Sequence, residues 1–115
     1  MIVCVLDDLL FSVKISTAAK LLGSDVYFER TPGMAFTRVK ETQPSLVIFD
    51  LNSVKLNPLG AIAELKADPA TRGIRTLGFV SHVHADVIEA ARQAGVDEVL
   101  ARSAFSAQLE EILAR

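Results

Sequence analysis

The chain has 115 residues and a formal net charge of −2, with 50% of its residues hydrophobic and 23% charged. Such a length and composition indicate one globular domain, residues 1–115, and exclude a disordered or fibrous protein. The basic residues form no run or patch, so we expect no direct contact with nucleic acid. No apolar run reaches transmembrane length and only one cysteine is present, so we expect a cytoplasmic protein with no membrane partner.

Five short apolar runs predict the strands of a sheet. Two of them are unbroken and lead straight into acidic residues: Asp7 and Asp8 follow the first run, and Asp50 ends the other. Unbroken apolar runs are typical of strands that are buried on both faces of a parallel sheet. The second strand has a mixed pattern that suits a sheet edge. The predicted strands span residues 2–6, 25–29, 46–50, 76–80 and 98–101.

Helical patterns alternate with these runs. The first predicted helix has an apolar face and is stopped by Gly23. Pro32, as a first helical residue, places the start of the second helix at Thr31. Ser103 is predicted to cap the last helix, whose apolar residues repeat at helical spacing. The predicted helices span residues 11–22, 31–42, 58–67, 86–94 and 103–113.

The regular alternation of strand and helix defines the fold class. Strands that are joined by helical crossovers pair in parallel, and the helices cover both faces of the sheet. We therefore predict an α/β protein with a flavodoxin-like (βα)5 doubly wound sheet in three layers, α/β/α, and the strand order 2-1-3-4-5.

Polar side chains stand where the predicted strands end. Ser81 and Arg102 follow the fourth and fifth strands, and in the predicted order they are neighbours of the acids after strands 1 and 3. Crowded carboxylates raise one another's pKa unless a cation intervenes, and Mg²⁺ prefers such oxygen ligands. A hydroxyl and a guanidinium opposite the metal suit phosphate oxygens. Taken alone, Asp50 would start a turn or cap a helix, but the combination favours a phosphoryl-accepting carboxylate.

These residues give the chain a family likeness. Over essentially its whole length it resembles the response regulator receiver domain, the CheY-like phosphoacceptor module of two-component signalling. The motifs that carry the resemblance are VLDD at residues 5–8, VIFDLN at 47–52, FVS at 79–81 and AARQAGVDEVLARSAF at 90–105.

The resemblance implies a role for each residue at the strand ends. Asp50 would be the phosphoacceptor, and Ser81 and Arg102 would stabilise the phosphoryl group. No residue would be catalytic in the sense of an enzyme. The implied partners are a histidine kinase or phosphotransfer protein and a downstream protein effector, and a homodimer is compatible with the family. The implied ligands of Mg²⁺ are Asp7, Asp8, Asp50 and, through its backbone carbonyl, Asn52.

Several positions depart from the family pattern. Arg102 stands where the family has lysine, and the planar guanidinium is not equivalent to a compact ammonium. Ser103 replaces the usual proline, and the loop after Asp50 is longer than the usual form. Val99 stands where many receivers carry a switch aromatic, so we expect phosphorylation to act mainly on residues 51–57. These departures leave open a pseudo-receiver that acts by protein contact alone.

Other candidate sites are weaker. His82 and His84 are the only histidines, and two imidazoles on a loop make a poor zinc site, so we expect them to line the rim of the site. Cys4 lies in an apolar run and should be a buried, inert thiol. The chain has no G-x-G-x-x-G or Walker motif, which argues against nucleotide binding. A Mg²⁺-dependent hydrolase on a similar sheet is the remaining alternative.

Overall fold

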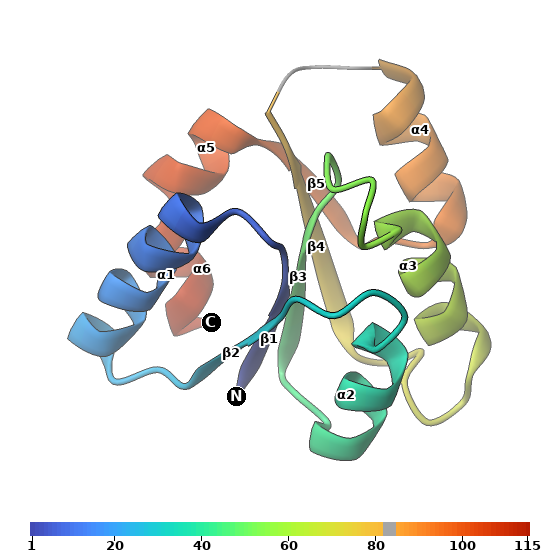
Figure 1. Cartoon of the computed structure of the whole chain (residues 1–115), viewed down its shortest axis with the longest axis horizontal. Coiled ribbons are helices and arrows are strands. Elements are labelled where there is room, and N and C mark those ends of the chain that lie inside the picture. Colours follow the sequence, from blue (N-terminus) through green and yellow to red (C-terminus); the bar gives the residue numbers. More distant parts are fainter. Residues whose placement is uncertain (82–84) are drawn as a thin grey trace.

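The computed structural model describes residues 1–81 and 85–115, and strands and helices alternate along them (Figure 1). All strand pairs are parallel, and the sheet has the order β2-β1-β3-β4-β5, which confirms the predicted topology. The strands are β1 (Ile2–Val5), β2 (Val26–Glu29), β3 (Leu46–Asp50), β4 (Arg75–Val80) and β5 (Glu98–Ala101).

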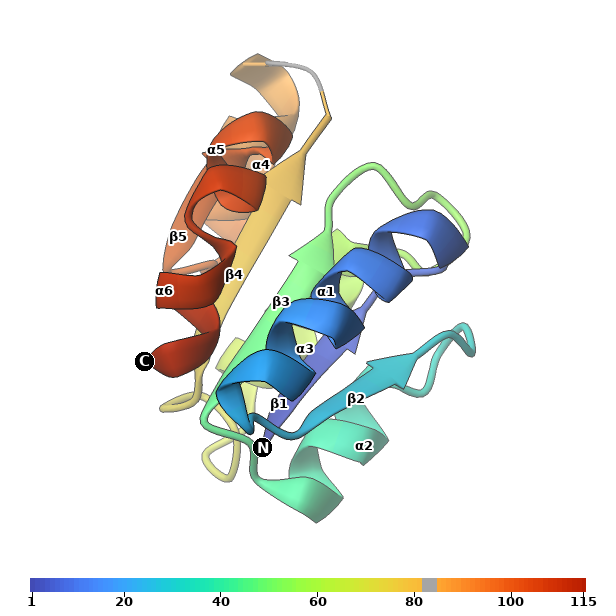
Figure 2. The same ribbon diagram turned by 90° about the vertical axis from the view of Figure 1, so that its left-hand side faces the viewer.

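The helices form a layer on each face of the sheet, as Figures 1 and 2 show from two sides. Helices α1, α5 and α6 cover one face, and α2, α3 and α4 cover the other. This arrangement confirms the predicted flavodoxin-like fold in three layers. The helices are α1 (Leu9–Leu22), α2 (Ala35–Thr42), α3 (Pro58–Ala67), α4 (Ala85–Ala94), α5 (Arg102–Ala107) and α6 (Leu109–Ala114).

Two hydrophobic cores explain why the central strands are apolar without a break. Successive side chains of a strand point to opposite faces of the sheet. In β1, Cys4 packs in the core under α1, α5 and α6, whereas Val3 and Val5 pack in the core under α2, α3 and α4. In β3, Ile48 and Phe49 divide in the same way. A strand that is buried on both faces therefore has no position for a polar side chain until it reaches its end.

The predicted start of the second helix is wrong. Helix α2 begins at Ala35 and not at Thr31, and Pro32 lies in the turn before it. The cause is Gly33, which has a φ of 79°. That angle lies in the left-handed region, where glycine is comfortable and an α-helix cannot continue. The proline therefore shapes the turn and is not the first residue of the helix.

The predicted last helix is divided into two. Helices α5 and α6 meet at Gln108, whose φ of −103° and ψ of 11° interrupt the helical path. Ser103 lies inside α5, and the cap position is Ala101, whose side chain cannot accept a hydrogen bond. Phe105 and Leu109 still fall on the same core on either side of the break. The apolar spacing therefore predicted the buried face correctly but could not reveal the break.

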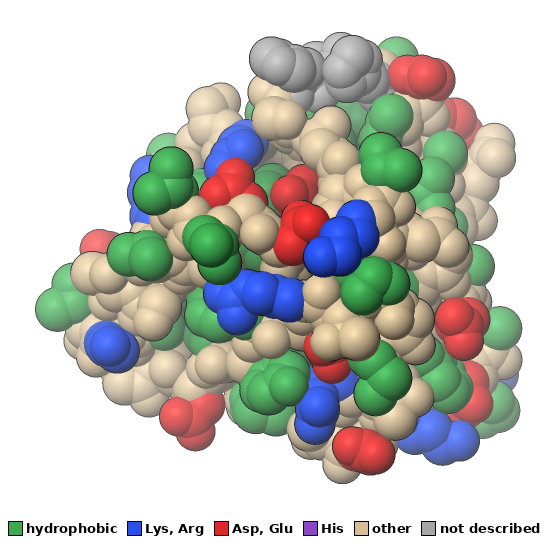
Figure 3. All heavy atoms as spheres, in the orientation of Figure 1, with side chains coloured by type: hydrophobic (Ala, Val, Ile, Leu, Met, Phe, Trp, Pro, Cys, Tyr) green, Lys and Arg blue, Asp and Glu red, His purple; other side chains and the backbone are tan. Residues whose placement is uncertain are grey.

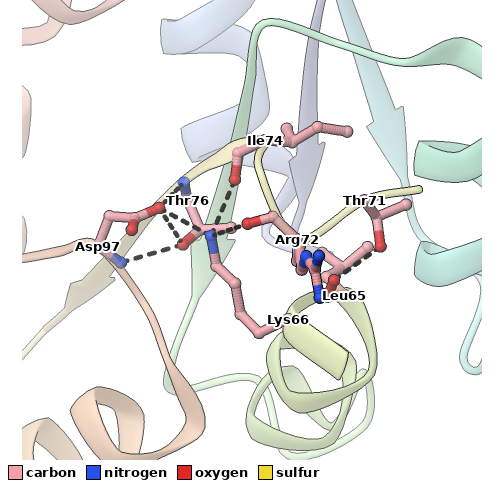
Figure 4. A network of polar contacts seen from close by, with 7 residues as sticks. All are labelled: Leu65, Lys66, Thr71, Arg72, Ile74, Thr76 and Asp97. Atoms are coloured by element: carbon pink, nitrogen blue, oxygen red, sulfur yellow. Dashed lines mark hydrogen bonds and ion pairs between the residues drawn. The ribbon is translucent and has the colours of Figure 1, made fainter. Parts of the chain in front are cut away.

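A polar network joins α3 to the amino-terminal ends of β4 and β5 (Figure 4). The Nζ of Lys66 donates to the carbonyl oxygens of Arg72 and Ile74, at 3.2 and 3.0 Å, and to Oδ2 of Asp97 at 3.0 Å. The same Oδ2 accepts from the backbone N–H and the hydroxyl of Thr76, at 2.8 and 3.0 Å. One carboxylate oxygen thus ties two strands and a helix together.

Two further expectations concern burial and membranes. Cys4 is fully buried, and its burial raises the pKa of the thiol, which confirms an inert cysteine. Within residues 1–81 and 85–115, no helix is both long and apolar enough to cross a membrane.

Candidate functional site

Asp50 is the last residue of β3 and lies beside Phe79 of β4 at the carboxyl edge of the sheet. It is buried, with 8% of its surface exposed. Its Oδ1 accepts a hydrogen bond from the backbone N–H of Asn52 at 2.9 Å. Asp50 therefore does start a turn, as an isolated aspartate would. The turn holds the carboxylate in place at the strand end through Oδ1, and the other oxygen, Oδ2, takes no part in this hydrogen bond.

The loop that follows Asp50 is held against β4. The backbone N–H of Leu51 donates to the carbonyl oxygen of Phe79 at 3.0 Å. The Leu51 side chain packs over Gly78, where a β-carbon would come within 2.7 Å of it. Only glycine permits this approach, because contacts so short do not occur between carbon atoms. Gly78 thus leaves room for the Leu51 side chain against β4.

Asp8 is held by a hydrogen bond at each of its carboxylate oxygens. Its Oδ1 accepts from the backbone N–H of Phe11 at 3.0 Å, which makes Asp8 the N-cap of α1. Its Oδ2 accepts from Nη2 of Arg102 at 2.8 Å. The Phe11 hydrogen bond and, after it, the Arg102 guanidinium lower the pKa of this carboxyl. The cap also explains why α1 begins at Leu9, two residues earlier than predicted.

Arg102 is held by an aromatic ring as well as by a charge. It is the first residue of α5, directly after β5, and its guanidinium carbon lies 4.3 Å from the centroid of the Phe11 ring. The Phe11 ring in turn contacts Phe79 and Phe105, at centroid distances of 5.1 and 5.7 Å. Phe11 therefore positions both members of the ion pair: its backbone holds Asp8, and its ring holds Arg102.

Two residues of the loop after Asp50, Asn52 and Ser53, make hydrogen bonds to the predicted site residues Ser81 and Asp7. The hydroxyl of Ser53 donates to Oδ1 of Asp7 at 3.1 Å. The backbone N–H and the hydroxyl of Ser81 donate to the side-chain Oδ1 of Asn52, at 2.6 and 2.8 Å. Sequence reasoning expected only the backbone carbonyl of Asn52 to take part in the site. It missed Ser53 altogether, although a hydroxyl three residues after Asp50 was the available signal.

The electrostatics show that the predicted residues converge. Burial raises the pKa of Asp50, and the neighbouring charges of Asp7 and Asp8 raise it further. The N–H of Asn52 and the charge of Arg102 oppose this rise. Figure 3 shows acidic side chains gathered on this face with basic side chains beside them. A buried carboxylate among like charges is an acceptor for a positively charged or electrophilic group.

The donor atoms suit a hard cation in chemistry, but their arrangement holds an arginine. Carboxylate oxygens are the ligands that Mg²⁺ prefers. In the part of the chain that the structure describes, however, no group of three or more histidine, cysteine or acidic residues is arranged to hold a metal ion. Both oxygens of Asp8 are instead engaged by Phe11 and Arg102. His82 and His84, the weaker candidates, lie outside the described residues.

Comparisons with known proteins place the fold. No family model matches the chain, and a search of curated proteins finds no match either. Among solved structures, the receiver domain of the sensor histidine kinase PA1611 from Pseudomonas aeruginosa, with a magnesium ion in its active site cleft, has a TM-score of 0.84 and 21% identity over 97% of this chain and 92% of that one. The chemotaxis response regulator CheY4 of Vibrio cholerae has a TM-score of 0.83 and 12% identity over 97% and 93%.

The phosphorylated cyanobacterial phytochrome response regulator RcpA has a TM-score of 0.79 and 21% identity, over 98% of this chain and 88% of that one. These structural neighbours are response regulators and receiver domains. The identities are low, so the likeness establishes the fold alone: the chain has the same flavodoxin-like fold as these domains.

Proposed function

We propose that the chain is a receiver module of two-component signalling that accepts a phosphoryl group on Asp50 from a histidine kinase or phosphotransfer protein and acts in the cytoplasm on a downstream protein effector. The observation that supports this most is the convergence of groups around Asp50. A buried carboxylate ends β3, the acids that follow β1 and a guanidinium from α5 act on its pKa, and a hydroxyl follows β4. Such a set suits a carboxylate that accepts a phosphoryl group.

The transfer uses the carboxylate as nucleophile. An oxygen of Asp50 forms a bond to phosphorus as the bond from phosphorus to the donor's histidine nitrogen breaks, and that nitrogen keeps the electron pair. The product is an acyl phosphate with three charged or polar oxygens. Arg102 supplies positive charge toward them and Ser81 supplies a hydroxyl donor.

A bound Mg²⁺ would neutralise charge on the phosphoryl oxygens. The carboxylates of Asp7 and Asp50 and the backbone carbonyl of Asn52 would hold it, joined by Asp8 once Arg102 has released that carboxylate. The Pseudomonas domain with magnesium in its cleft and the phosphorylated RcpA support both parts of the proposal by analogy of fold.

A second function has one observation in its favour. The ion pair between Arg102 and Asp8 engages a carboxylate that is a proposed metal ligand. A pseudo-receiver that signals by protein contact alone needs no metal and would keep this ion pair. Val99, which stands where many receivers carry a switch aromatic, also bears on the choice between the two functions. It packs on the core under α4, and the expectation that phosphorylation acts on residues 51–57 more than on this face stays a prediction.

Labelling by a small phosphodonor separates the two functions. Acetyl phosphate with Mg²⁺ should add one phosphoryl group to the wild type, seen by intact mass, and none to Asp50→Asn. Glu29→Gln is the matched control, because Glu29 is a buried carboxylate at the end of β2, the edge strand beside β1. This variant should be labelled like the wild type. Equal labelling of Asp50→Asn would disprove the assignment, and an unlabelled wild type would favour the pseudo-receiver.

A further inference from the structure

Arg102 and Asp8 form an ion pair, here called the clamp, in which each side chain also contacts Phe11. Asp8 is oriented by its capping bond to the N–H of Phe11, and Arg102 is oriented by the ring of the same residue. An ion pair between two mobile surface side chains gains little, because ordering them costs side-chain entropy. Here both side chains have a second contact that orders them, so the pair forms at a smaller entropic cost.

The guanidinium therefore stands where a divalent cation would need to bind. A metal ion that uses Asp8 must replace the hydrogen bond from Nη2 of Arg102 at 2.8 Å. The capping bond lies on the other oxygen, Oδ1, so α1 does not have to unwind for the exchange. The site thus offers one carboxylate to two alternative cations.

We propose that Arg102 is the resident counter-cation of Asp8, and that a divalent cation binds at the acidic residues only by displacing the guanidinium from Asp8. The inference rests on the proposed metal site, but it concerns a property of this chain's own arginine.

The exposure of the pair decides whether exchange is feasible. The side chains of Arg102 and Asp8 are 36% and 34% exposed, so solvent screens their attraction and an incoming cation reaches the carboxylate from outside. A deeply buried pair would resist exchange. The clamp should therefore weaken divalent binding without preventing it, by about tenfold, which corresponds to about 1.4 kcal/mol.

Three variants separate displacement from simple repulsion between cations. Arg102→Lys keeps the positive charge but loses the planar fork and the stacking on a ring. Phe11→Leu keeps both the arginine and the backbone cap but removes the ring beneath the guanidinium. Arg30→Lys is the matched control, because Arg30 also lies over a phenylalanine ring, that of Phe28 at 5.1 Å. Charge repulsion alone predicts the wild-type affinity for all three variants.

The decisive experiment measures Mn²⁺ affinity by the electron paramagnetic resonance of the free ion, together with the side-chain Nε–H signals of arginine by nuclear magnetic resonance. We expect Arg102→Lys to bind Mn²⁺ about tenfold more tightly than the wild type, Phe11→Leu to lie between them, and Arg30→Lys to match the wild type. In the wild type, Mg²⁺ should shift the Arg102 signal and leave that of Arg30 in place.

The negative results are distinguishable. Equal Mn²⁺ affinity in wild type and Arg102→Lys, or an Arg102 signal that does not move at saturating Mg²⁺, overturns the displacement and leaves the proposed metal site standing. No binding by any variant overturns both. Circular dichroism of Phe11→Leu checks its fold, and the arginine variants keep the test decisive if that variant is unfolded.

Discussion

At the scale of single residues, the site contains two aspartates with opposite tendencies. Burial raises the pKa of Asp50, whereas the hydrogen bond from Phe11 and the guanidinium of Arg102 lower the pKa of Asp8. Folding therefore favours the neutral form of Asp50 and the charged form of Asp8. Of the two, Asp50, the proposed acceptor, is the one whose negative charge the fold tolerates less, which makes its neutralisation by a bound group favourable.

This contrast predicts how stability depends on pH. Because the folded pKa of Asp50 lies above its ordinary value of 3.8, the ionised carboxylate destabilises the fold at neutral pH. In metal-free solution, Asp50→Asn should therefore raise the free energy of unfolding by roughly 1 kcal/mol. The gain should shrink as the pH falls through the folded pKa of Asp50 and vanish below the ordinary value.

Urea unfolding across this pH range, followed by circular dichroism, provides the measurement. Asp8→Asn is the control with the opposite sign: it keeps the cap and loses the charge that pairs with Arg102, so it should not stabilise the fold. A loss of stability in Asp50→Asn at neutral pH would contradict the inference that the ionised carboxylate of Asp50 destabilises the fold.

At the scale of elements, the amino-terminal ends of β4 and β5 differ in role from their carboxyl ends. Their carboxyl ends carry Ser81 and Arg102 to the site, and their amino-terminal ends are joined through Asp97 to Thr76 and Lys66 (Figure 4). A strand that is fixed in register at one end cannot slide at the other. The network therefore supports the site from the opposite edge of the sheet.

Removing the shared carboxylate should destabilise this arrangement. Asp97→Ala removes the side-chain acceptor of the Thr76 N–H and the charged partner of the Lys66 ammonium, which keeps only the carbonyl oxygens of Arg72 and Ile74. We expect a loss of about 1–3 kcal/mol in the free energy of unfolding. Glu64→Ala, on the exposed side of α3, should change stability by less than about 0.5 kcal/mol. Denaturant unfolding of both variants tests this, and equal effects would show that the network contributes nothing specific.

The acid response of Asp97 gives the same network a second signature. Burial would raise the pKa of Asp97, but the hydrogen bonds from Thr76 and Lys66 outweigh it and lower that pKa. The charged form therefore stabilises the fold above the ordinary value of 3.8, and the contribution is lost as the pH falls through the lower, folded value.

At the scale of the whole molecule, two hydrophobic cores share one sheet. Ile112 of α6 and Ile62 of α3 are fully buried, one in each core. The strands between the cores contribute side chains to both. Neither helix layer can be lost without exposing one face of the same strands, so the chain should unfold as a unit.

Truncation of either isoleucine should therefore weaken the same transition. Ile62→Ala and Ile112→Ala should each lower the free energy of unfolding by about 2–5 kcal/mol, and Val13→Ala, at a side chain that is 63% exposed, by far less. Far-ultraviolet circular dichroism and the fluorescence of Tyr27, the chain's one tyrosine, should report coincident transitions in every variant. Separate transitions for the two layers would contradict a single cooperative unit.

The sequence by itself determined the order of the sheet and the residues at its carboxyl edge. An unbroken apolar run before Asp50 can only be buried on both faces, and helical crossovers force parallel pairing. Together these rules bring the ends of β1, β3, β4 and β5 to one edge. They act through local pattern and chain connectivity, which a sequence displays directly.

The tertiary structure alone decided which partner each polar side chain takes. Asp8 could cap a helix, bind a metal or pair with a cation, and these choices differ in free energy by amounts of only about 1 kcal/mol. Arg102 is 94 positions away along the chain, and its pairing with Asp8 depends on where the ring of Phe11 lies. Such a choice is settled by the packing of several elements at once, because none of them alone places the competing groups within contact distance.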